Sequence, residues 1–332
     1  MAPPVARLKR CARGQGLVLC IALAAVVAAQ TPSDDFPGKR VLLDAHNAYP
    51  YQGRWTDRID RALATGTPLA IEQDLVWRPA TATTPAHSIV SHGEPWTGDE
   101  PTLRDFFERI RPIATRALTS ASHEQWPLIT LNLDFKDSHP QHFAAIWTLL
   151  GEYEAWLTTA PRTPDAAAVQ PLALGPVLVL TGSDPAQQAA FHDEVPIGSR
   201  LRLFGAVQPA AAPDGAMAGK PGVLAATNYR RWSNNPWSVV EPEGQNNAEE
   251  WSAEDSARLR LNVRAAHDAG LWIRFYTLNG HSTDDGERMG WTPGYNFKSL
   301  DAARIRWRAA IAAGVDFIAT DQYEDYEQIS SR

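Results

Sequence analysis

Acidic side chains recur two residues apart in two apolar segments of the chain. Glu72 and Asp74 lie in the segment IEQDL, and Asp134 lies with Lys136 in the segment LNLDFKD. In a β-strand, residues two apart leave the same face of the sheet. Three carboxylates that converge from neighbouring strands repel one another, and they stay ionised near neutral pH only beside positive charge. The pattern predicts a site for a hard divalent cation, Mg²⁺ or Ca²⁺, with a plain Asp134–Lys136 ion pair as the simpler alternative.

A histidine follows each of the first two apolar segments. His46 comes after the run VLLDA, and His92 lies in SIVSHGE, downstream of Glu72 and Asp74. Imidazoles titrate near neutral pH, so two of them that bracket an acidic pair favour acid and base catalysis over a structural role. Asp44 shares a face with His46 and either orients it or is structural. The remaining histidines fall in loops and helices, where we expect exposure for His87, His123, His139, His142, His192 and His281 and a structural role for His267.

The rest of the chain predicts the elements that position these residues. Apolar runs predict eight buried strands within residues 41–46, 68–77, 126–137, 177–182, 200–207, 223–229, 271–280 and 314–323. Helical patterns lie over 57–66, 102–119, 139–158, 185–195, 252–270 and 299–314. We expect a flexible insertion at 208–222. The alternation of strands with helices or long loops predicts one (β/α)8 barrel domain over residues 31–332, with a doubly wound sheet as the alternative.

In such a barrel, chemistry takes place at the carboxyl ends of the strands. The residues expected at or near these ends are His46, Glu72, Asp74, Asp134, Lys136, Asn228, Tyr276, Asn279 and Asp321. Arg274 lies two residues before Tyr276, so it either reaches a bound phosphate from the barrel interior or pairs with a core carboxylate.

A loop rich in aromatic and basic residues is expected after the sixth strand, over residues 230–247. Trp232, Trp237 and Tyr229 would rim the site there, and they either bind a headgroup cation through their rings or pin the loop by packing. Arg230 and Arg231 are candidates for a second phosphate contact.

The first 30 residues have the pattern of a cleaved secretory signal. A basic stretch precedes the apolar run GLVLCIALAAVVAA, and small residues follow. The run of about 14 residues is shorter than the roughly 20 that span a bilayer, which argues against a membrane anchor. We expect cleavage near Ala29 or Gln30 and a mature protein that is secreted or periplasmic.

Both cysteines, Cys11 and Cys20, lie in this segment, so we expect a mature chain without disulfides. The full chain has 31 Lys and Arg against 38 Asp and Glu, a formal net charge of −7, and four of the basic residues precede residue 30. This acidic balance argues against a nucleic-acid partner, which requires a basic patch. The oligomeric state is left open.

The pattern as a whole resembles the phospholipase C-like phosphodiesterase superfamily. It has a histidine after the first strand, E-x-D on the second, a second histidine downstream and D-x-K on the third. The segments FYTLNG and GVDFIATDQYE are similar to signatures of the glycerophosphodiester phosphodiesterases, and the branch with the fungal altered-inheritance-of-mitochondria protein is also similar. The resemblance covers nearly the whole chain after residue 30.

The resemblance implies a role for each site residue. Glu72, Asp74 and Asp134 would hold one Mg²⁺ or Ca²⁺, and His46 and His92 would be the acid and base. The substrate contacts we expect are Lys136 on the phosphate, together with Arg274, Tyr276, Asn279 and Trp232. Two departures bear on substrate preference: Asn47 and Ala48 stand where the family has Arg and Gly, and Gly93 follows His92 where it has Asp.

The sequence thus predicts a secreted, metal-dependent phosphodiesterase that hydrolyses glycerophosphodiesters or phospholipid headgroups. A phospholipase D-like lyase that forms a cyclic phosphate and a non-catalytic barrel that binds phosphorylated headgroups remain as alternatives. Transient contact with a membrane surface also stays open.

Overall fold

The computed structural model describes residues 37–51, 53–207, 225–285 and 293–330, all within the unit that spans residues 32–332. The predicted signal over 1–30 and the predicted insertion over 208–222 lie outside the described residues.

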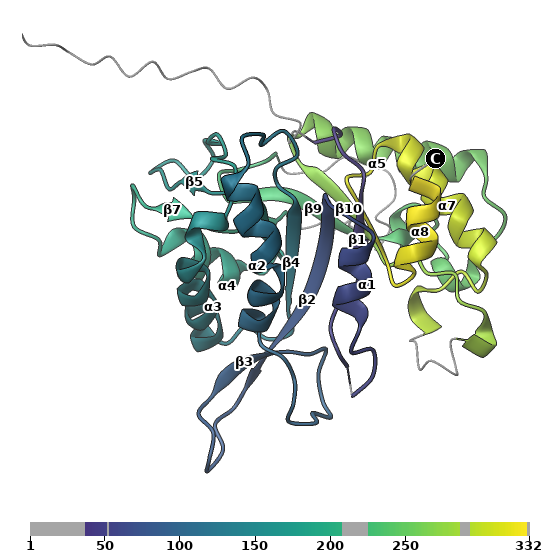
Figure 1. Ribbon diagram of the computed structural model, residues 1–332. Helices are drawn as coiled ribbons and strands as arrows, with labels where there is room; N and C mark the ends of the chain where they lie inside the picture. The colour runs from purple at the N-terminus through teal and green to yellow at the C-terminus, as the bar shows by residue number, and fades with distance from the viewer. Residues whose placement is uncertain (1–36, 52, 208–224, 286–292, 331–332) are drawn as a thin grey trace, which may run out of the picture. The chain divides into compact units, whose positions relative to one another are not determined.

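Eight parallel strands form a closed ring that follows the order of the chain (Figure 1). The ring runs β1-β2-β4-β6-β8-β9-β10-β11, and β11 pairs with β1 to close it. The strands are β1 (Leu42–Ala45), β2 (Leu69–Arg78), β4 (Ile129–Phe135), β6 (Val177–Thr181), β8 (Phe204–Ala206), β9 (Arg230–Pro236), β10 (Trp272–Tyr276) and β11 (Phe317–Thr320). Because every pair around the ring is parallel and most connections carry a helix, the predicted (β/α)8 barrel is confirmed.

Helices flank the strands, with α2 and α3 on one side of Figure 1 and α5, α7 and α8 on the other. Their bounds are α1 (Arg58–Ala64), α2 (Leu103–Thr119), α3 (Pro140–Glu152), α4 (Pro185–Gln188) with a π-helical turn η2 (Ala189–Asp193), α5 (Ala253–Asp268), α7 (Leu300–Ala313) and α8 (Tyr323–Ser330). Capping boxes of Thr102 with Asp105 and of Ser252 with Asp255 begin α2 and α5, because these side chains satisfy free N–H groups of the first turn. None of the helices in the described part of the chain is both long and apolar enough to cross a membrane.

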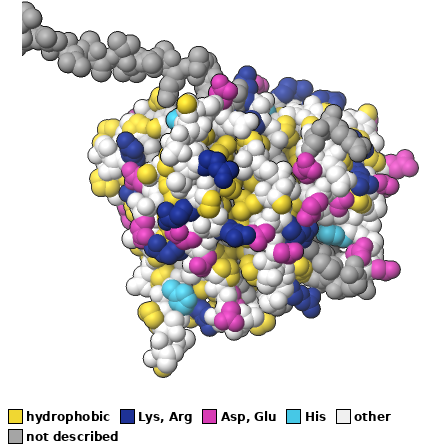
Figure 2. Space-filling model, viewed as in Figure 1, with side chains coloured by type: hydrophobic (Ala, Val, Ile, Leu, Met, Phe, Trp, Pro, Cys, Tyr) yellow, Lys and Arg dark blue, Asp and Glu magenta, His cyan; other side chains and the backbone are white. Residues whose placement is uncertain are grey.

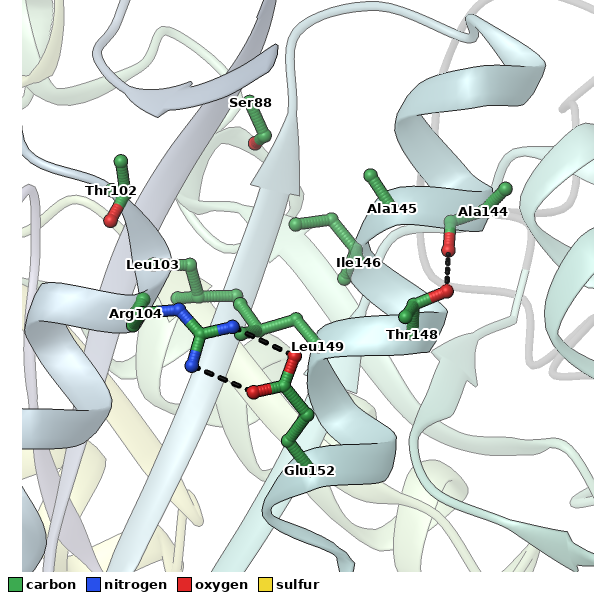
Figure 3. A pocket seen from close by; sticks show the side chains of 10 residues that line it. All are labelled: Ser88, Thr102, Leu103, Arg104, Ala144, Ala145, Ile146, Thr148, Leu149 and Glu152. Carbon is green, nitrogen blue, oxygen red and sulfur yellow. Dashed lines mark hydrogen bonds and ion pairs between the residues drawn. The ribbon is translucent and has the colours of Figure 1, made fainter.

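Shorter elements decorate the barrel. They are β3 (His87–Val90), β5 (Ala160–Pro161), β7 (Arg200–Leu201), and the 3-10 turns η1 (Glu154–Trp156), η3 (Trp237–Val239), η4 (Gln245–Asn247) and η5 (Pro293–Tyr295). β3 pairs antiparallel with the second half of β2, and a pocket of about 500 Å³ opens beside it, between α2 and α3 (Figure 3). On the face drawn in Figure 2, basic and acidic side chains are interspersed rather than gathered by sign.

The predicted sixth strand was wrong. Residues 225–229 precede the strand, and the strand itself is β9, over Arg230–Pro236, for which the sequence predicts a loop. The residues of β9 are largely polar, which is why its sequence resembles a loop. One of these polar residues, Asn234, accepts a hydrogen bond from Arg274 at 3.1 Å. The predicted fifth strand over 200–207 is also two pieces, since β7 pairs with β5 and only β8 joins the barrel.

Candidate active site

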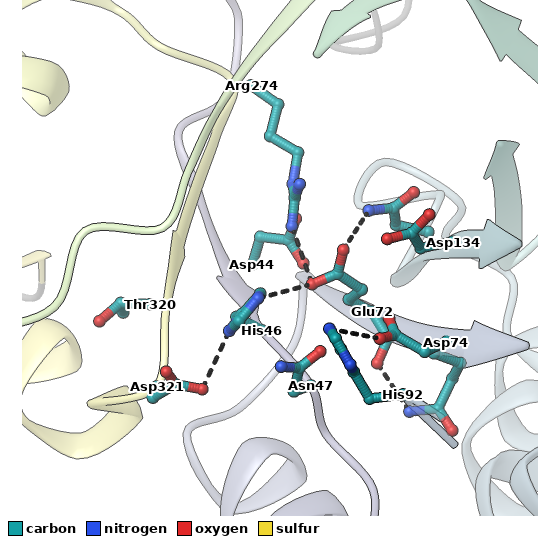
Figure 4. A network of polar contacts seen from close by, with 12 residues as sticks. Asp44, His46, Asn47, Glu72, Asp74, His92, Asp134, Arg274, Thr320 and Asp321 are labelled. Carbon is teal, nitrogen blue, oxygen red and sulfur yellow. Dashed lines mark hydrogen bonds and ion pairs between the residues drawn. The ribbon is translucent and has the colours of Figure 1, made fainter. Parts of the chain in front are cut away.

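The three predicted cation ligands meet at the carboxyl ends of β2 and β4 (Figure 4). In the parallel register of these strands, Asp74 lies opposite Asp134, and Glu72 lies opposite Asn132. One oxygen from each of Glu72, Asp74 and Asp134 lies within 4.8 Å of the others. Asn132 donates a hydrogen bond to Glu72 Oε1 at 3.3 Å, which fixes that carboxylate. The predicted convergence of the carboxylates is therefore present in the fold.

Lys136 bridges the outer pair of carboxylates. Its Nζ lies 2.8 Å from Asp74 Oδ2 and 2.7 Å from Asp134 Oδ2. Burial raises the pKa of Asp74 to about 7, because Lys136 offsets the burial only in part and the neighbouring carboxylates add to it. One lysine thus leaves the outer pair, Asp74 and Asp134, short of positive charge. A compact set of carboxylate oxygens with such a deficit fits a hard divalent cation, so the residues present match the group that the pattern predicts.

Arg274 holds the inner end of the site. Its buried guanidinium donates from Nε to Asp44 and lies 3.1 Å from Glu72 Oε2 through Nη2. Burial would raise the pKa of Glu72, but Arg274 and then His46 outweigh it and lower that pKa. Of the two roles expected for Arg274, the structure therefore has the pairing with core carboxylates.

His46 is anchored on both ring nitrogens. Nδ1 lies 3.0 Å from Asp321 Oδ1, and Nε2 lies 3.5 Å from Glu72 Oε2. Burial alone would lower the pKa of His46, but Asp321 and Glu72 outweigh it and raise that pKa. Asp321 itself accepts hydrogen bonds from Arg58 and Asn279. The residue that orients His46 is therefore Asp321, at the end of β11, rather than Asp44.

His92 approaches the same carboxylates without such an anchor. It follows β3, its side chain is largely exposed, and its Nε2 lies 4.0 Å from Asp74 Oδ2. The edge of its ring faces Tyr51, with the ring centroids 6.0 Å apart. Burial and then Lys136 lower the pKa of His92. Figure 4 shows both imidazoles beside the carboxylates of Glu72 and Asp74.

Asn47, which stands where the resembled family has arginine, has a backbone role. Its φ of 49° is in the left-handed region, which asparagine tolerates better than most residues. Its side chain accepts a hydrogen bond from Tyr49 at 3.0 Å, and the backbone N–H of Ala48 donates to the carbonyl of Glu72. Asn47 and Ala48, which differ from the family pattern, thus form a tight turn against β2.

Two of the expected substrate contacts, Tyr276 and Asn279, have different surroundings. Tyr276 is half-buried at the end of β10, with its ring edge-to-face with Tyr295 at 6.0 Å. Asn279 is buried and donates to Asp321, so it supports His46 rather than lining an open surface.

Trp232 is not at the rim, and that prediction was wrong. It lies within β9, fully buried in a cluster inside the barrel, on the same strand face as Asn234, and its Nε1 donates to the carbonyl of Thr181 at 2.8 Å. Trp237 and Tyr229 are also buried, which leaves packing as their role. The cause is the misplaced sixth strand, because a tryptophan assigned to a loop belongs instead to a strand.

The same shift of the strand relocates three polar residues. Asn228 precedes β9, so it lies at the amino end of the strand, where it donates to the carbonyl of Pro161. Arg230 binds the carbonyl of Ala206 and the side chain of Gln188, and Arg231 binds Asn228. Among the described residues, the contacts of Asn228, Arg230 and Arg231 do not include the carboxylate cluster.

Two histidines expected at the surface are buried. His142 and His192 have no exposed surface, and each places Nδ1 near a neighbouring aspartate, Asp137 and Asp193 respectively. The sequence reading placed them outside the core because helix position alone does not show which face a residue occupies.

Some residues of the site were not predicted. Arg58 lies on α1, and only the folded chain brings it to Asp321, so no local pattern marked it. Asn132 did carry a signal, because it shares a strand face with Asp134 and Lys136. Asn234 was hidden by the misplaced strand.

The chain is similar to several solved structures, each at low sequence identity. A glycerophosphoryl diester phosphodiesterase from Parabacteroides distasonis is 12% identical, with a TM-score of 0.47 over 91% of this chain and 88% of that chain. A calcium-dependent phosphoinositol-specific phospholipase C from a Pseudomonas species is 13% identical, with a TM-score of 0.44 over 81% and 93%. HPPK-DHPS from Plasmodium falciparum is 9% identical, with a TM-score of 0.42 over 89% and 46%.

No family model matches the sequence, and no curated protein matches it. These structures include proteins of different kinds, so only the site residues of this chain bear on its function.

Proposed function

We propose that this protein is a metal-dependent phosphodiesterase that acts on glycerophosphodiesters or phospholipid headgroups. The observation that carries the proposal is the pairing of two imidazoles, His46 and His92, with a three-carboxylate cluster at the carboxyl ends of barrel strands. A single histidine beside an acidic pair is compatible with a structural role. Two of them on different elements, one anchored and one exposed, provide the two proton-transfer groups that cleavage of a diester requires.

The chemistry follows from the charge of the substrate. A phosphodiester is anionic and repels nucleophiles, and its leaving alkoxide is poor unless it is protonated. A divalent cation held by Glu72, Asp74 and Asp134 would offset the charge on a phosphate oxygen. His46 and His92 then divide the proton work, one taking the proton of the attacking hydroxyl and the other giving a proton to the leaving oxygen.

Two side chains at the rim complete the proposed substrate site. Lys136 has a partly exposed side chain and bridges Asp74 and Asp134 with its ammonium group, so a phosphate can share that group. Tyr276, in contact with Tyr295, offers an aromatic face to the part of the substrate beyond the phosphate.

Hydrolysis of bis-p-nitrophenyl phosphate with added Mg²⁺ or Ca²⁺ tests the proposal. We expect turnover that chelation abolishes and that His46→Ala and His92→Ala each reduce by roughly a hundredfold or more, as for loss of a general acid or base. His123→Ala is the matched control, because that exposed histidine stacks on Trp126, before the start of β4. Tight binding of a phosphodiester without turnover would favour the non-catalytic barrel instead.

We also propose that the chain is exported and loses its first 30 residues. The support is the basic stretch, apolar run and small residues at the amino terminus. Sequencing of the amino terminus of protein recovered from the periplasm or medium tests this. A mature chain that begins near Gln30 or Thr31 is expected, and a full-length chain confined to the cytoplasm would contradict it.

A further inference from the structure

A second histidine cluster uses residues that the proposed phosphodiesterase site does not. His142 on α3 places Nε2 2.8 Å from Oγ of Ser88 and Nδ1 3.0 Å from Oδ1 of Asp137. Ser88 belongs to β3 and Asp137 follows β4, so three separate elements bring these groups together. A hydroxyl, an imidazole and a carboxylate in this order, each at hydrogen-bond distance, form the arrangement that activates a serine nucleophile on unrelated folds.

The carboxylate of this cluster is held in place. Asp137 accepts hydrogen bonds from the backbone N–H of Trp77 at 2.7 Å and of His139 at 3.1 Å. Burial alone would raise the pKa of Asp137, but these N–H groups and His142 lower it. An ionised Asp137 keeps a proton on Nδ1 of His142, which leaves Nε2 free to accept a proton from Ser88.

The imidazole is rigid and desolvated. His142 has no exposed surface, and its ring packs against Trp77 at 5.6 Å and edge-on to Phe135 at 4.9 Å between centroids. Burial lowers the pKa of His142, so the ring is neutral near pH 7 and acts as a base. The cluster therefore has a fixed base, a fixed orienting carboxylate and a hydroxyl between the base and solvent.

Ser88 opens onto the pocket between α2 and α3. The residue is only half-buried, and it lines that pocket of about 500 Å³ together with Leu103, Ile146 and Leu149. Figure 3 shows Ser88 at one end and the Arg104–Glu152 ion pair at the other. A largely apolar pocket of this volume with a hydroxyl at one end suits a short aliphatic chain attached to the reacting group.

The amino end of α2 lies beside Ser88. Thr102, Leu103 and Arg104 line the same pocket, and the backbone N–H of Val90, two residues after Ser88, donates to the carbonyl of Pro101 at 2.7 Å. First-turn N–H groups of a helix lack partners within the helix, and the helix dipole favours negative charge there. The capping box occupies the N–H groups of Thr102 and Asp105, which leaves those of Leu103 and Arg104 as the donors for an oxyanion that forms near Ser88.

We propose that Ser88, His142 and Asp137 form a second site, which hydrolyses carboxylic esters with short aliphatic acyl groups. Oγ of Ser88 bonds to the carbonyl carbon while its proton passes to Nε2 of His142. The bond to the alcohol oxygen then breaks, and the alcohol leaves with that proton. Water next attacks the acyl-serine, gives a proton through Nε2 back to Oγ, and releases the carboxylic acid. The reaction needs only the ester and water.

Labelling of the folded full chain with an alkyl fluorophosphonate tests whether Ser88 is nucleophilic. We expect a covalent adduct that mass spectrometry maps to Ser88 and that is absent after heat denaturation. Asp137→Asn should slow labelling by at least roughly tenfold, because it removes the group that sets the tautomer of His142. A histidine that only tied β3 to α3 would make the same hydrogen bonds but leave Ser88 unlabelled, and that result would overturn the proposal.

Hydrolysis of p-nitrophenyl butyrate separates the two sites. Ser88→Ala should lose ester hydrolysis and keep phosphodiesterase activity, whereas His46→Ala should do the reverse. Ser122→Ala, at an exposed serine away from the pocket, is the matched control. Equal ester hydrolysis by Ser88→Ala and the unchanged chain would contradict the second site, whatever the outcome for the phosphodiester.

Discussion

The candidate active site has two halves that balance their charge differently. In the inner half, made by Asp44, Glu72, Arg274, His46 and Asp321, every carboxylate is buried and contacts an arginine or a histidine. The outer half is made by Asp74, Asp134, Lys136 and His92. There a single lysine, Lys136, contacts both carboxylates. Apart from the buried Asp74, the outer side chains are also more open, with exposed fractions of 24% for Lys136, 48% for Asp134 and 57% for His92.

The difference indicates where binding acts. Each carboxylate of the inner half already has a cationic partner in the protein, so the geometry of this half is set before any ligand arrives. In the outer half, one lysine faces two carboxylates. Burial and the neighbouring carboxylates therefore raise the pKa of Asp74 to about 7. An added cation and an anionic substrate therefore change the outer half most. We expect substitutions in the inner half to lower the free energy of unfolding and those in the outer half to weaken binding.

Arg274→Met should produce the largest effect, on stability. It leaves Asp44 and Glu72 buried without their arginine, and loss of one partner of a buried ion pair costs about 3–5 kcal/mol. Chemical denaturation measures the change. Arg109→Met is the control, because its pair with Asp60 is exposed and such pairs contribute about 0–1 kcal/mol. Equal losses for both variants would mean that the inner half is not held by charge.

Asp134→Asn should act on binding rather than on folding. Because Asp134 is half-exposed, its loss should leave the free energy of unfolding nearly unchanged, while calcium affinity falls by roughly tenfold or more. Calorimetric titration measures the affinity, with the exposed Asp268→Asn as control. Glu72→Gln should lose affinity as well. Unchanged affinity in both ligand variants would rule out the cation site.

The two histidines should affect stability with opposite dependence on pH in the absence of metal. The folded-state pKa of His46 is raised, so its stabilising effect is present below about pH 6.5 and is lost as the pH rises through the higher folded value. The pKa of His92 is lowered, so its cost appears as the pH falls below about 6.5. Unfolding of His46→Gln and His92→Gln from pH 5.5 to 8.5 measures this. If the free energies of unfolding of the two variants changed with pH in the same way, the predicted difference between the inner and outer halves would be wrong.

Tyr276→Ala should have the smallest effect. Loss of the rim aromatic is expected to raise KM by roughly two- to fivefold, since one weak aromatic contact is worth about 0.5–1 kcal/mol, and to leave kcat nearly unchanged. Steady-state kinetics on a glycerophosphodiester checks this. A large fall in kcat would instead place Tyr276 in contact with the reacting atoms.

Much of the fold and half of the site were predictable from local patterns. Alternation along a strand is a local property, so the shared face of Glu72 and Asp74 and that of Asp134 and Lys136 follow directly from spacing. The apolar runs located seven of the eight barrel strands. β9 escaped because a barrel interior that holds Arg274 requires polar partners, and polar residues in a strand resemble a loop.

The remainder depends on contacts between distant parts of the chain. Asp321 meets His46 only because β11 closes the barrel beside β1, and Arg58 reaches both from a helix. Nothing in the spacing of these residues marks such a contact. The same is true of Ser88 and His142, which are 54 residues apart in the chain.

Phosphorus NMR of a glycerophosphodiester and phospholipid panel, incubated with the protein and Mg²⁺ or Ca²⁺, decides whether the protein is a metal-dependent phosphodiesterase. We expect a phosphomonoester or cyclic phosphate signal that requires the metal and disappears in both His46→Ala and His92→Ala. The product also decides between hydrolysis and a lyase reaction. Folded protein that binds the metal but converts no phosphodiester in the panel would show that the site is not a phosphodiesterase site.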